Sequence, residues 1–238
     1  MRILPLSSMV TMLCLRKLAS SRLGKSSRVC APRDSLRSEA ARQAAWASCS
    51  MSFLKFAILA TLGECIALRI TTGVYNRPGF GVLPKAIIWG LLGIGIKIAF
   101  TVYGAGTFKL LNEMGLLSGA PTTFGAKLLM SFSISVLINT LFAPVLMITH
   151  KLTDLHIAAT GGTLNSLCTK PDVAALFRTI DWNSMWSFVL KKTIPFFWIP
   201  AHTITFMLPA HFQVVFAAAL GIALGVILAF AGLRAKKA

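Results

Sequence analysis

The sequence has very few acidic residues and few charged residues of any kind. Its 238 residues include 7 Asp plus Glu against 24 Lys plus Arg, and only 13% are charged. Soluble domains carry about 25% charged residues, and 55% of this chain is hydrophobic. This composition excludes an ordinary water-soluble globular domain and is typical of an integral membrane protein.

The cysteines and glycines do not form the patterns of known metal or catalytic motifs. Five cysteines are present, without a C-x-x-C pair or a metal-ligand spacing. We expect them to be small apolar fillers or free thiols. The chain has no phosphate loop, no G-x-S-x-G and no dinucleotide fingerprint. We therefore predict that it is not an enzyme and has no cofactor.

A formal net charge of +17 is compatible with a nucleic-acid partner. A nucleic-acid binder needs a solvent-exposed basic face. Here the basic residues lie in short stretches that flank apolar runs, which is how membrane topology is encoded. We predict the lipid bilayer as the partner, and no nucleic acid.

Residues 1–50 differ in composition from the rest of the chain. They hold nine Lys or Arg, two acids and many Ser and Ala, which is the composition of an organellar transit peptide. Alternatively they are a mis-annotated extension before the start at Met51. The first interpretation predicts a mitochondrial inner membrane and the second a bacterial cytoplasmic membrane. Both predict that residues 1–50 are disordered and that residues 51–238 form the transmembrane helical domain.

Five apolar runs follow Met51, and a spanning helix needs about 20 residues. The runs are Phe53–Ile70, Lys85–Phe108, Lys127–Thr149, Ser184–Leu208 and Phe212–Leu233. We predict an all-α polytopic transmembrane bundle of four to five helices. The fourth helix should be kinked, because Pro195 and Pro200 each remove a backbone donor.

The basic residues between the runs predict the orientation. Eleven of them flank the spans on one side of the membrane and three on the other, if the chain starts at Met51. The positive-inside rule then places the loop His150–Asn183 and the C-terminus inside. Residues 1–50 would add nine charges to the outer side and remove this bias. We therefore predict that they are cleaved or never made.

Three polar residues stand near the middle of predicted spans: Glu64, Lys97 and Asn139. An ionisable group in the hydrocarbon region costs roughly 2.5–3.5 kcal/mol on insertion scales unless it is paired. We predict that the three face one another across the bundle. Two interpretations stay open, a pore or substrate site and a structural ion pair that fixes helix register.

The kinked fourth span adds three more site candidates. His202, Thr203 and Thr205 follow the prolines and could satisfy the carbonyls that the prolines leave without donors. Broken helices that face a cavity are where transporters and channels place their sites. A kink that only fits neighbouring helices is the alternative.

The last span carries a stripe of small residues at every fourth position. Such stripes let helix backbones approach closely. The stripe consists of Ala217, Gly221, Gly225 and Ala229. It predicts close packing either within one chain or between two copies, which leaves a homo-oligomer open.

The best group of metal-ligand types lies in HKLTDLH, with His150, Asp154 and His156. On a continuous helix, His150 and Asp154 share one face and His156 lies off it. Zinc sites usually have tighter support than this. We favour a polar helix-end cap and loop anchor over a metal site.

The segment FFWIPAHTITFMLP resembles a family signature. Its pattern W-x-P-A-x-x-x-x-F-x-x-P is similar to the C-terminal signature of the family of the 22-kDa peroxisomal membrane protein and mitochondrial Mpv-seventeen, especially its bacterial branch. The residues that carry the resemblance are Trp198, Pro200, Ala201, Phe206 and Pro209. Gln213 stands where the eukaryotic members have a basic residue.

The resemblance implies a small multi-pass helical protein of organelle or bacterial membranes. Members of the family are suspected of forming weakly selective channels or of moving small metabolites. We therefore expect a weakly selective channel or small-solute transporter. The alternative is a non-conducting membrane scaffold or assembly factor, in which the same polar residues tie the bundle together.

Overall fold

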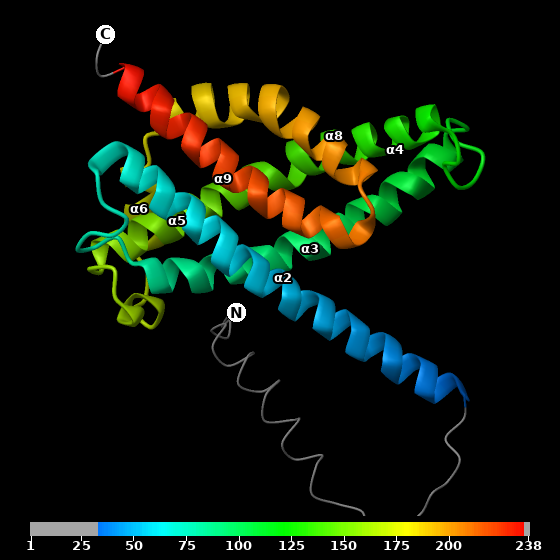
Figure 1. Cartoon of the computed structure of the whole chain (residues 1–238), viewed down its shortest axis with the longest axis horizontal. Helices are drawn as coiled ribbons and strands as arrows, with labels where there is room; N and C mark the ends of the chain where they lie inside the picture. Colours follow the sequence, from blue (N-terminus) through cyan, green and yellow to red (C-terminus); the bar gives the residue numbers. More distant parts are fainter. Residues whose placement is uncertain (1–32, 236–238) are drawn as a thin grey trace, which may run out of the picture. The chain divides into compact units, whose positions relative to one another are not determined.

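The computed structural model describes residues 33–235, and the regular structure in that range is helical. The chain divides into two compact units, Met1–Gln43 and Ala44–Ala238. Of the first unit, only the opening turns of α2 are described. Figure 1 shows the helices in chain order. They are α2 (Arg33–Thr72), α3 (Val82–Glu113), α4 (Phe124–Leu137), the π-helix η1 (Ile138–Phe142), α5 (Ala143–Ala159), the 3₁₀-helix η2 (Leu164–Leu167), α6 (Val173–Thr179), α7 (Trp182–Ser184), the π-helix η3 (Met185–Trp198), α8 (Ile199–Met207) and α9 (Ala210–Ala235).

Within residues 33–235, four helical segments are long and apolar enough to cross a membrane. They are Ser38–Thr72, Val82–Glu113, Phe124–Ala159 and Ala210–Ile227. Large apolar side chains such as Ile98, Phe132 and Phe196 are exposed on the outside of these and neighbouring helices. An apolar exterior is what a bilayer requires of the protein that it surrounds. The chain is a helical bundle with the architecture of a multi-pass membrane protein, as its sequence predicts.

The predicted fourth span is divided between η3 and α8. Pro195 lies inside η3, and Pro200 stands at the start of α8. The Ile199 N–H donates to the carbonyl of Ile194, five residues earlier, so the π-type pattern extends to the junction with α8. Neither proline can donate to an α-helical ladder. The helix therefore changes from π-type to α-type hydrogen bonding beside the prolines, and its kink stays a prediction.

The extension before Met51 is helical where it is described. Residues 33–50 form the first part of α2 rather than a disordered segment. The stretch contains many Ala and neither Gly nor Pro, so nothing in it breaks a helix that continues from the first span. Residues 1–32 lie outside the described part of the chain. Cleavage of the extension stays a prediction.

The small residues of α9 pack against α2 within one chain. A Cβ atom added at Gly63 would lie 3.0 Å from Ile222 Cα, and one at Gly225 would lie 3.6 Å from the Gly63 carbonyl oxygen. Figure 1 shows α9 running alongside α2. Glycine makes this approach of two backbones sterically acceptable. The stripe therefore has an intramolecular role, and the homo-oligomer stays a prediction.

Two glycine-containing turns interlock at one end of the bundle. The turn after α2 and the turn after α5 touch so closely that a Cβ at Gly162 would lie 2.7 Å from the Gly79 carbonyl carbon. Gly162 has φ +71° and Gly79 has φ +80°, a backbone region that favours glycine. This contact fixes the end of α5 against the start of α3.

Candidate functional site

A buried lysine joins two carboxylates at that end of the bundle. Lys85 Nζ lies 2.6 Å from Glu64 Oε2 and also donates to Asp154 Oδ1. The Lys85 side chain is 7% exposed, against 20% for Glu64 and 28% for Asp154. The Phe80 ring covers the ammonium, with its centroid 4.8 Å from Nζ. Because an unpaired ammonium is costly to bury, the two carboxylates are what allow Lys85 to lie inside.

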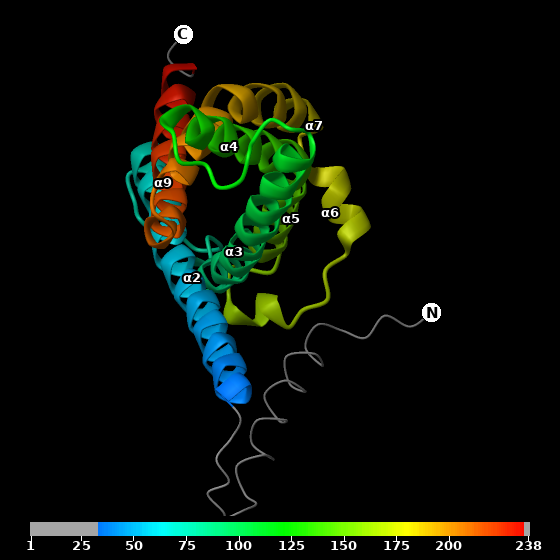
Figure 2. The same cartoon turned by 90° about the vertical axis from the view of Figure 1, so that its right-hand side faces the viewer.

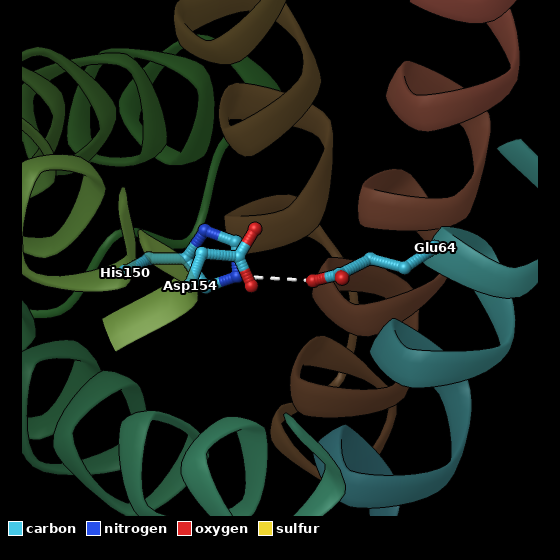
Figure 3. A group of neighbouring side chains, drawn as sticks. All are labelled: Glu64, His150 and Asp154. Atoms are coloured by element: carbon cyan, nitrogen blue, oxygen red, sulfur yellow. Dashed lines mark hydrogen bonds and ion pairs between the residues drawn. The ribbon is translucent and has the colours of Figure 1, made fainter. Parts of the chain in front are cut away.

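Trp89 and His150 engage the second oxygen of Glu64. Trp89 Nε1 donates to Glu64 Oε1 at 2.5 Å, and His150 Nε2 lies 3.0 Å from the same atom. The rings of Trp89 and His150 have centroids 4.2 Å apart. Figure 3 shows Glu64 pointing from α2 toward His150 and Asp154 of α5. We call Glu64, Lys85, Trp89, His150 and Asp154 the ion cluster.

The ion cluster lies where three helix ends meet. Glu64 precedes the end of α2 by eight residues, Lys85 is the fourth residue of α3, and Asp154 precedes the end of α5 by five. Because α2 and α3 are joined by the short connection 73–81, residues near the end of α2 and the start of α3 lie at a similar position along the bundle. The cluster therefore lies toward one end of these helices and not at their middle.

Lys97 is not part of this group. Twelve residues of α3 separate it from Lys85, which is roughly 18 Å along the helix axis and about a third of a turn around it. Within the described part of the chain its side chain makes no hydrogen bond or ion pair, and it does not line the cavity described below. The prediction that Glu64, Lys97 and Asn139 face one another is therefore wrong, since Glu64 pairs with Lys85 and Asn139 contacts His202.

Asn139 belongs to a second polar group deeper in the bundle. Its side chain is fully buried, and its Nδ2 donates to the Ser135 carbonyl at 2.8 Å and lies 3.0 Å from His202 Nδ1. Ser135 Oγ in turn donates to the Ile199 carbonyl at 2.7 Å. These bonds connect α4 and the π-helical turn η1 to α8. We call Asn139 and His202 the neutral pair.

A cavity of about 670 Å³ lies between the helices and reaches both polar groups. From Lys85 to Phe100, whose ring centroid is 6.0 Å from that of His202, α3 rises roughly 22 Å. The wall residues come mainly from α2, α3, η1, α5, η3, α8 and α9. Figure 2 shows α2, α3, α5 and α9 among the helices arranged about a common axis. Between the polar groups the walls are apolar, with Phe56, Ala60, Ile96, Leu146 and Ala217.

The other predicted residues of the fourth span divide into two sets. Thr203 and Thr205 are buried and donate to the carbonyls of Ile199 and Ala201, and neither lines the cavity. Trp198 does line it, beside His202, with ring centroids 5.1 Å apart. The threonine hydroxyls thus donate to backbone carbonyls, whereas Trp198 and His202 face the cavity.

The remaining positions of the family-like pattern have structural roles. Phe206 packs on Phe100 with ring centroids 4.7 Å apart. Pro209 separates α8 from α9, and the Gln213 amide donates to the Leu208 carbonyl at 3.0 Å across that turn. All four residues of the small stripe (Ala217, Gly221, Gly225 and Ala229) line the cavity.

The group of metal-ligand types in HKLTDLH is only partly brought together. His150 and Asp154 share one face of α5 and meet Glu64. His156 points elsewhere, and its Nε2 lies 2.9 Å from the Ser166 carbonyl oxygen. The expected loop anchor is therefore His156, whereas His150 and Asp154 belong to the ion cluster.

Sequence reasoning missed Lys85 and Trp89. Lys85 stands at the start of the apolar run Lys85–Phe108, where a lysine is interpreted as one of the flanking charges that set topology. One signal in the sequence could have found them. Lys85 and Trp89 are four residues apart, which places them on one face of a helix, and the same holds for His150 and Asp154. Two polar pairs at matching depth, opposite a lone Glu64, indicate one shared site.

Comparisons with known proteins identify no relative: no family model, no curated protein and no solved structure matches this chain.

Proposed function

We propose that this multi-pass membrane protein is a weakly selective channel or small-solute transporter. The observation that supports the proposal is the cavity that extends from the ion cluster to the neutral pair. The roughly 22 Å between these groups along α3 is a large part of a hydrocarbon core of about 30 Å. A protein that only ties helices together does not need a space of this length.

The charges along the cavity favour weak selectivity. Glu64 and Asp154 carry negative charge, and Lys85 and Lys151 carry positive charge on the same lining. With neutral histidines these four charges cancel. A path without a ring of one sign does not reject anions or cations strongly. Small neutral solutes and small ions of either sign are therefore the solutes that fit best.

The Trp198 indole adds a second argument for a wet interior. Its N–H is buried and has no acceptor among the described residues. Leaving such a donor unpaired costs about 1–3 kcal/mol, so a partner from the cavity, water or a solute oxygen, would stabilise it. Trp198 lies beside the neutral pair, where such a partner would be near His202 as well.

The test is a flux assay on the purified full chain in liposomes, with small neutral solutes, anions and cations. The informative variant is Gly221→Leu, because Gly221 lines the cavity and a Cβ there meets no atom within 4 Å. The matched control is Gly95→Leu, which is equally uncrowded but lies outside the cavity lining. We expect flux that Gly221→Leu reduces several-fold and Gly95→Leu leaves intact. Absence of flux from folded protein would contradict the proposal.

One observation favours a non-conducting scaffold or assembly factor as the second candidate. The ion cluster connects α2, α3 and α5 through Lys85 and Glu64, which is what a protein built for rigidity would need. In that case the bundle should be stable and should conduct none of the tested solutes. We propose transport in preference to this scaffold role, and we propose that the protein is not an enzyme.

Membership in the family of the 22-kDa peroxisomal membrane protein, with the Trp198–Pro209 pattern as its support, is likewise proposed. The same holds for the membrane: a mitochondrial inner membrane if residues 1–50 are a transit peptide, or a bacterial cytoplasmic membrane if translation starts at Met51. N-terminal sequencing of the protein isolated from membranes distinguishes these origins.

A further inference from the structure

Three side chains of metal-ligand type converge in the ion cluster. They are Glu64 from α2 and His150 and Asp154 from α5, and one ligand atom of each lies within 4.8 Å of the others. Figure 3 shows the three side chains pointing toward one another. Ligands of one zinc ion lie about 2.0–2.2 Å from the metal. A small inward movement of these side chains would therefore bring all three within reach of one ion.

This place already holds a cation. The Lys85 ammonium is bound by the carboxylates of both Glu64 and Asp154. With a neutral His150, the two carboxylates and one ammonium leave a net charge of −1. A divalent ion in place of the ammonium would neutralise the two carboxylates, and neutral imidazole is a good metal ligand.

The surroundings provide access and orientation. Glu64, His150 and Asp154 all line the large cavity, so an ion can approach without unfolding of the helices. Trp89 Nε1 donates to Glu64 Oε1, the oxygen that also faces His150. Hydrogen bonds of this kind from outside the ligand set orient a carboxylate ligand and tune the site.

The ligand types select the class of metal. Ca²⁺ takes six to eight oxygen ligands, whereas this site offers one imidazole and two carboxylates. One nitrogen and two oxygens with a position left for water suit Zn²⁺ and its neighbours among first-row metals.

From these observations we propose that Glu64, His150 and Asp154 form a binding site for a divalent transition-metal ion, which binds in competition with the Lys85 ammonium. The inference does not depend on conduction by the cavity. It assigns Lys85 a second role, that of an internal competitor that weakens metal binding in the native chain.

The test is titration of the purified full chain with Co²⁺, followed by visible absorption, and then displacement by Zn²⁺. Lys85→Met removes the competitor and should bind one Co²⁺ per chain, at least roughly tenfold more tightly than the native protein. Adding His150→Ala to Lys85→Met should abolish the Co²⁺ spectrum. Adding His156→Ala, which changes a histidine two residues beyond Asp154 and outside the cluster, should leave it unchanged.

A folded Lys85→Met chain that binds no Co²⁺, or that binds it without dependence on His150, would overturn the proposal. A Lys85→Met chain that folds only when Zn²⁺ is present would support it. If that variant does not fold under either condition, Co²⁺ titration of the native chain decides the matter. Binding that His150→Ala removes and His156→Ala spares supports the site, and the lack of such binding at millimolar Co²⁺ rejects it.

Discussion

The Lys85 ammonium lies 2.6 Å from the Glu64 carboxylate, from which it is separated by 21 residues and the turn between α2 and α3. The pair therefore closes the hairpin of the first two long helices, and Asp154 extends it to α5. A buried charge held by two partners on different helices depends on all three helices being correctly placed. This relationship makes the bundle sensitive to a change of charge at Lys85.

Replacement of Lys85 should destabilise the protein strongly. Lys85→Met leaves Glu64 and Asp154 without their cation, and removal of one partner from a buried ion pair costs about 3 kcal/mol or more. Lys97→Met is the matched control, because the Lys97 side chain has no ion pair within the described residues. It should not destabilise the protein, because it leaves no charged partner unpaired. Denaturant unfolding in detergent, without added metal, measures both. Equal losses would show that the ion cluster contributes little.

The interlocked turns give a second prediction. Gly161 and Gly162 both have positive φ, so alanine at either position should cost about 1–2 kcal/mol. Only at Gly162 would the new Cβ collide with backbone, 2.7 Å from the Gly79 carbonyl carbon, whereas at Gly161 it meets nothing within 4 Å. Gly162→Ala should therefore lose about 1–3 kcal/mol more than Gly161→Ala. Thermal unfolding of the two variants side by side tests this, and identical melting temperatures would contradict the close contact.

The sidedness of the loops can be tested with the native thiol Cys168. This residue is exposed in the loop between α5 and α6, which the basic residues place inside. In a chain with the other cysteines changed to serine, a membrane-impermeant maleimide should label Cys168 only from the side that carries the C-terminus. Ser118→Cys, in the turn between α3 and α4, should be labelled from the opposite side. Labelling of both from one side would reject the predicted topology.

The start of the predicted fourth span, at α7, should respond to acid. Asp181 accepts hydrogen bonds from the Ser184 hydroxyl at 2.6 Å and from its N–H at 3.1 Å, and these bonds hold the pKa of Asp181 below its usual value. A carboxylate with a lowered folded-state pKa stabilises the folded state above its unfolded-state pKa, and this contribution is lost as the pH falls through the folded-state pKa. Asp181→Asn should remove that part of the pH dependence. Amide hydrogen exchange at Ser184 near pH 5 and near pH 2.5, in both chains, measures it; equal pH dependence in the two would contradict the assignment.

The sequence predicts the helices of this fold better than it predicts their contacts. Hydropathy places the long helices, and Pro195 and Pro200 identify the interrupted one, because both signals are local. The partner of Glu64 is not local. It depends on how α3 is rotated and on where α2 ends. The apolar run Phe53–Ile70 places Glu64 near the middle of a span, whereas α2 covers Arg33–Thr72, so Glu64 lies eight residues before the end of a much longer helix.

The two polar groups illustrate the same difference. Asn139 and His202 could be identified singly as polar residues in apolar runs, but their contact requires the π-helical turn η1, for which the sequence gives no clear signal. The sequence does not single out Lys85, because a lysine at the edge of an apolar run resembles a flanking charge. From sequence alone, polar residues near helix ends are thus interpreted as residues that flank a span, even when the fold places their side chains in the interior.

The π-type hydrogen bonding of η3 also has a consequence for alignment and evolution. An i→i+5 helix holds more residues per turn than an i→i+4 helix. The segment from Met185 to Trp198 therefore contains more residues than an α-helix with the same number of turns. Deletion of one residue there can be absorbed when a turn reverts to α geometry, which leaves His202 facing the same neighbours. Homologues with a shorter stretch before the tryptophan are therefore best aligned with a gap inside η3 rather than with a shift of everything that follows.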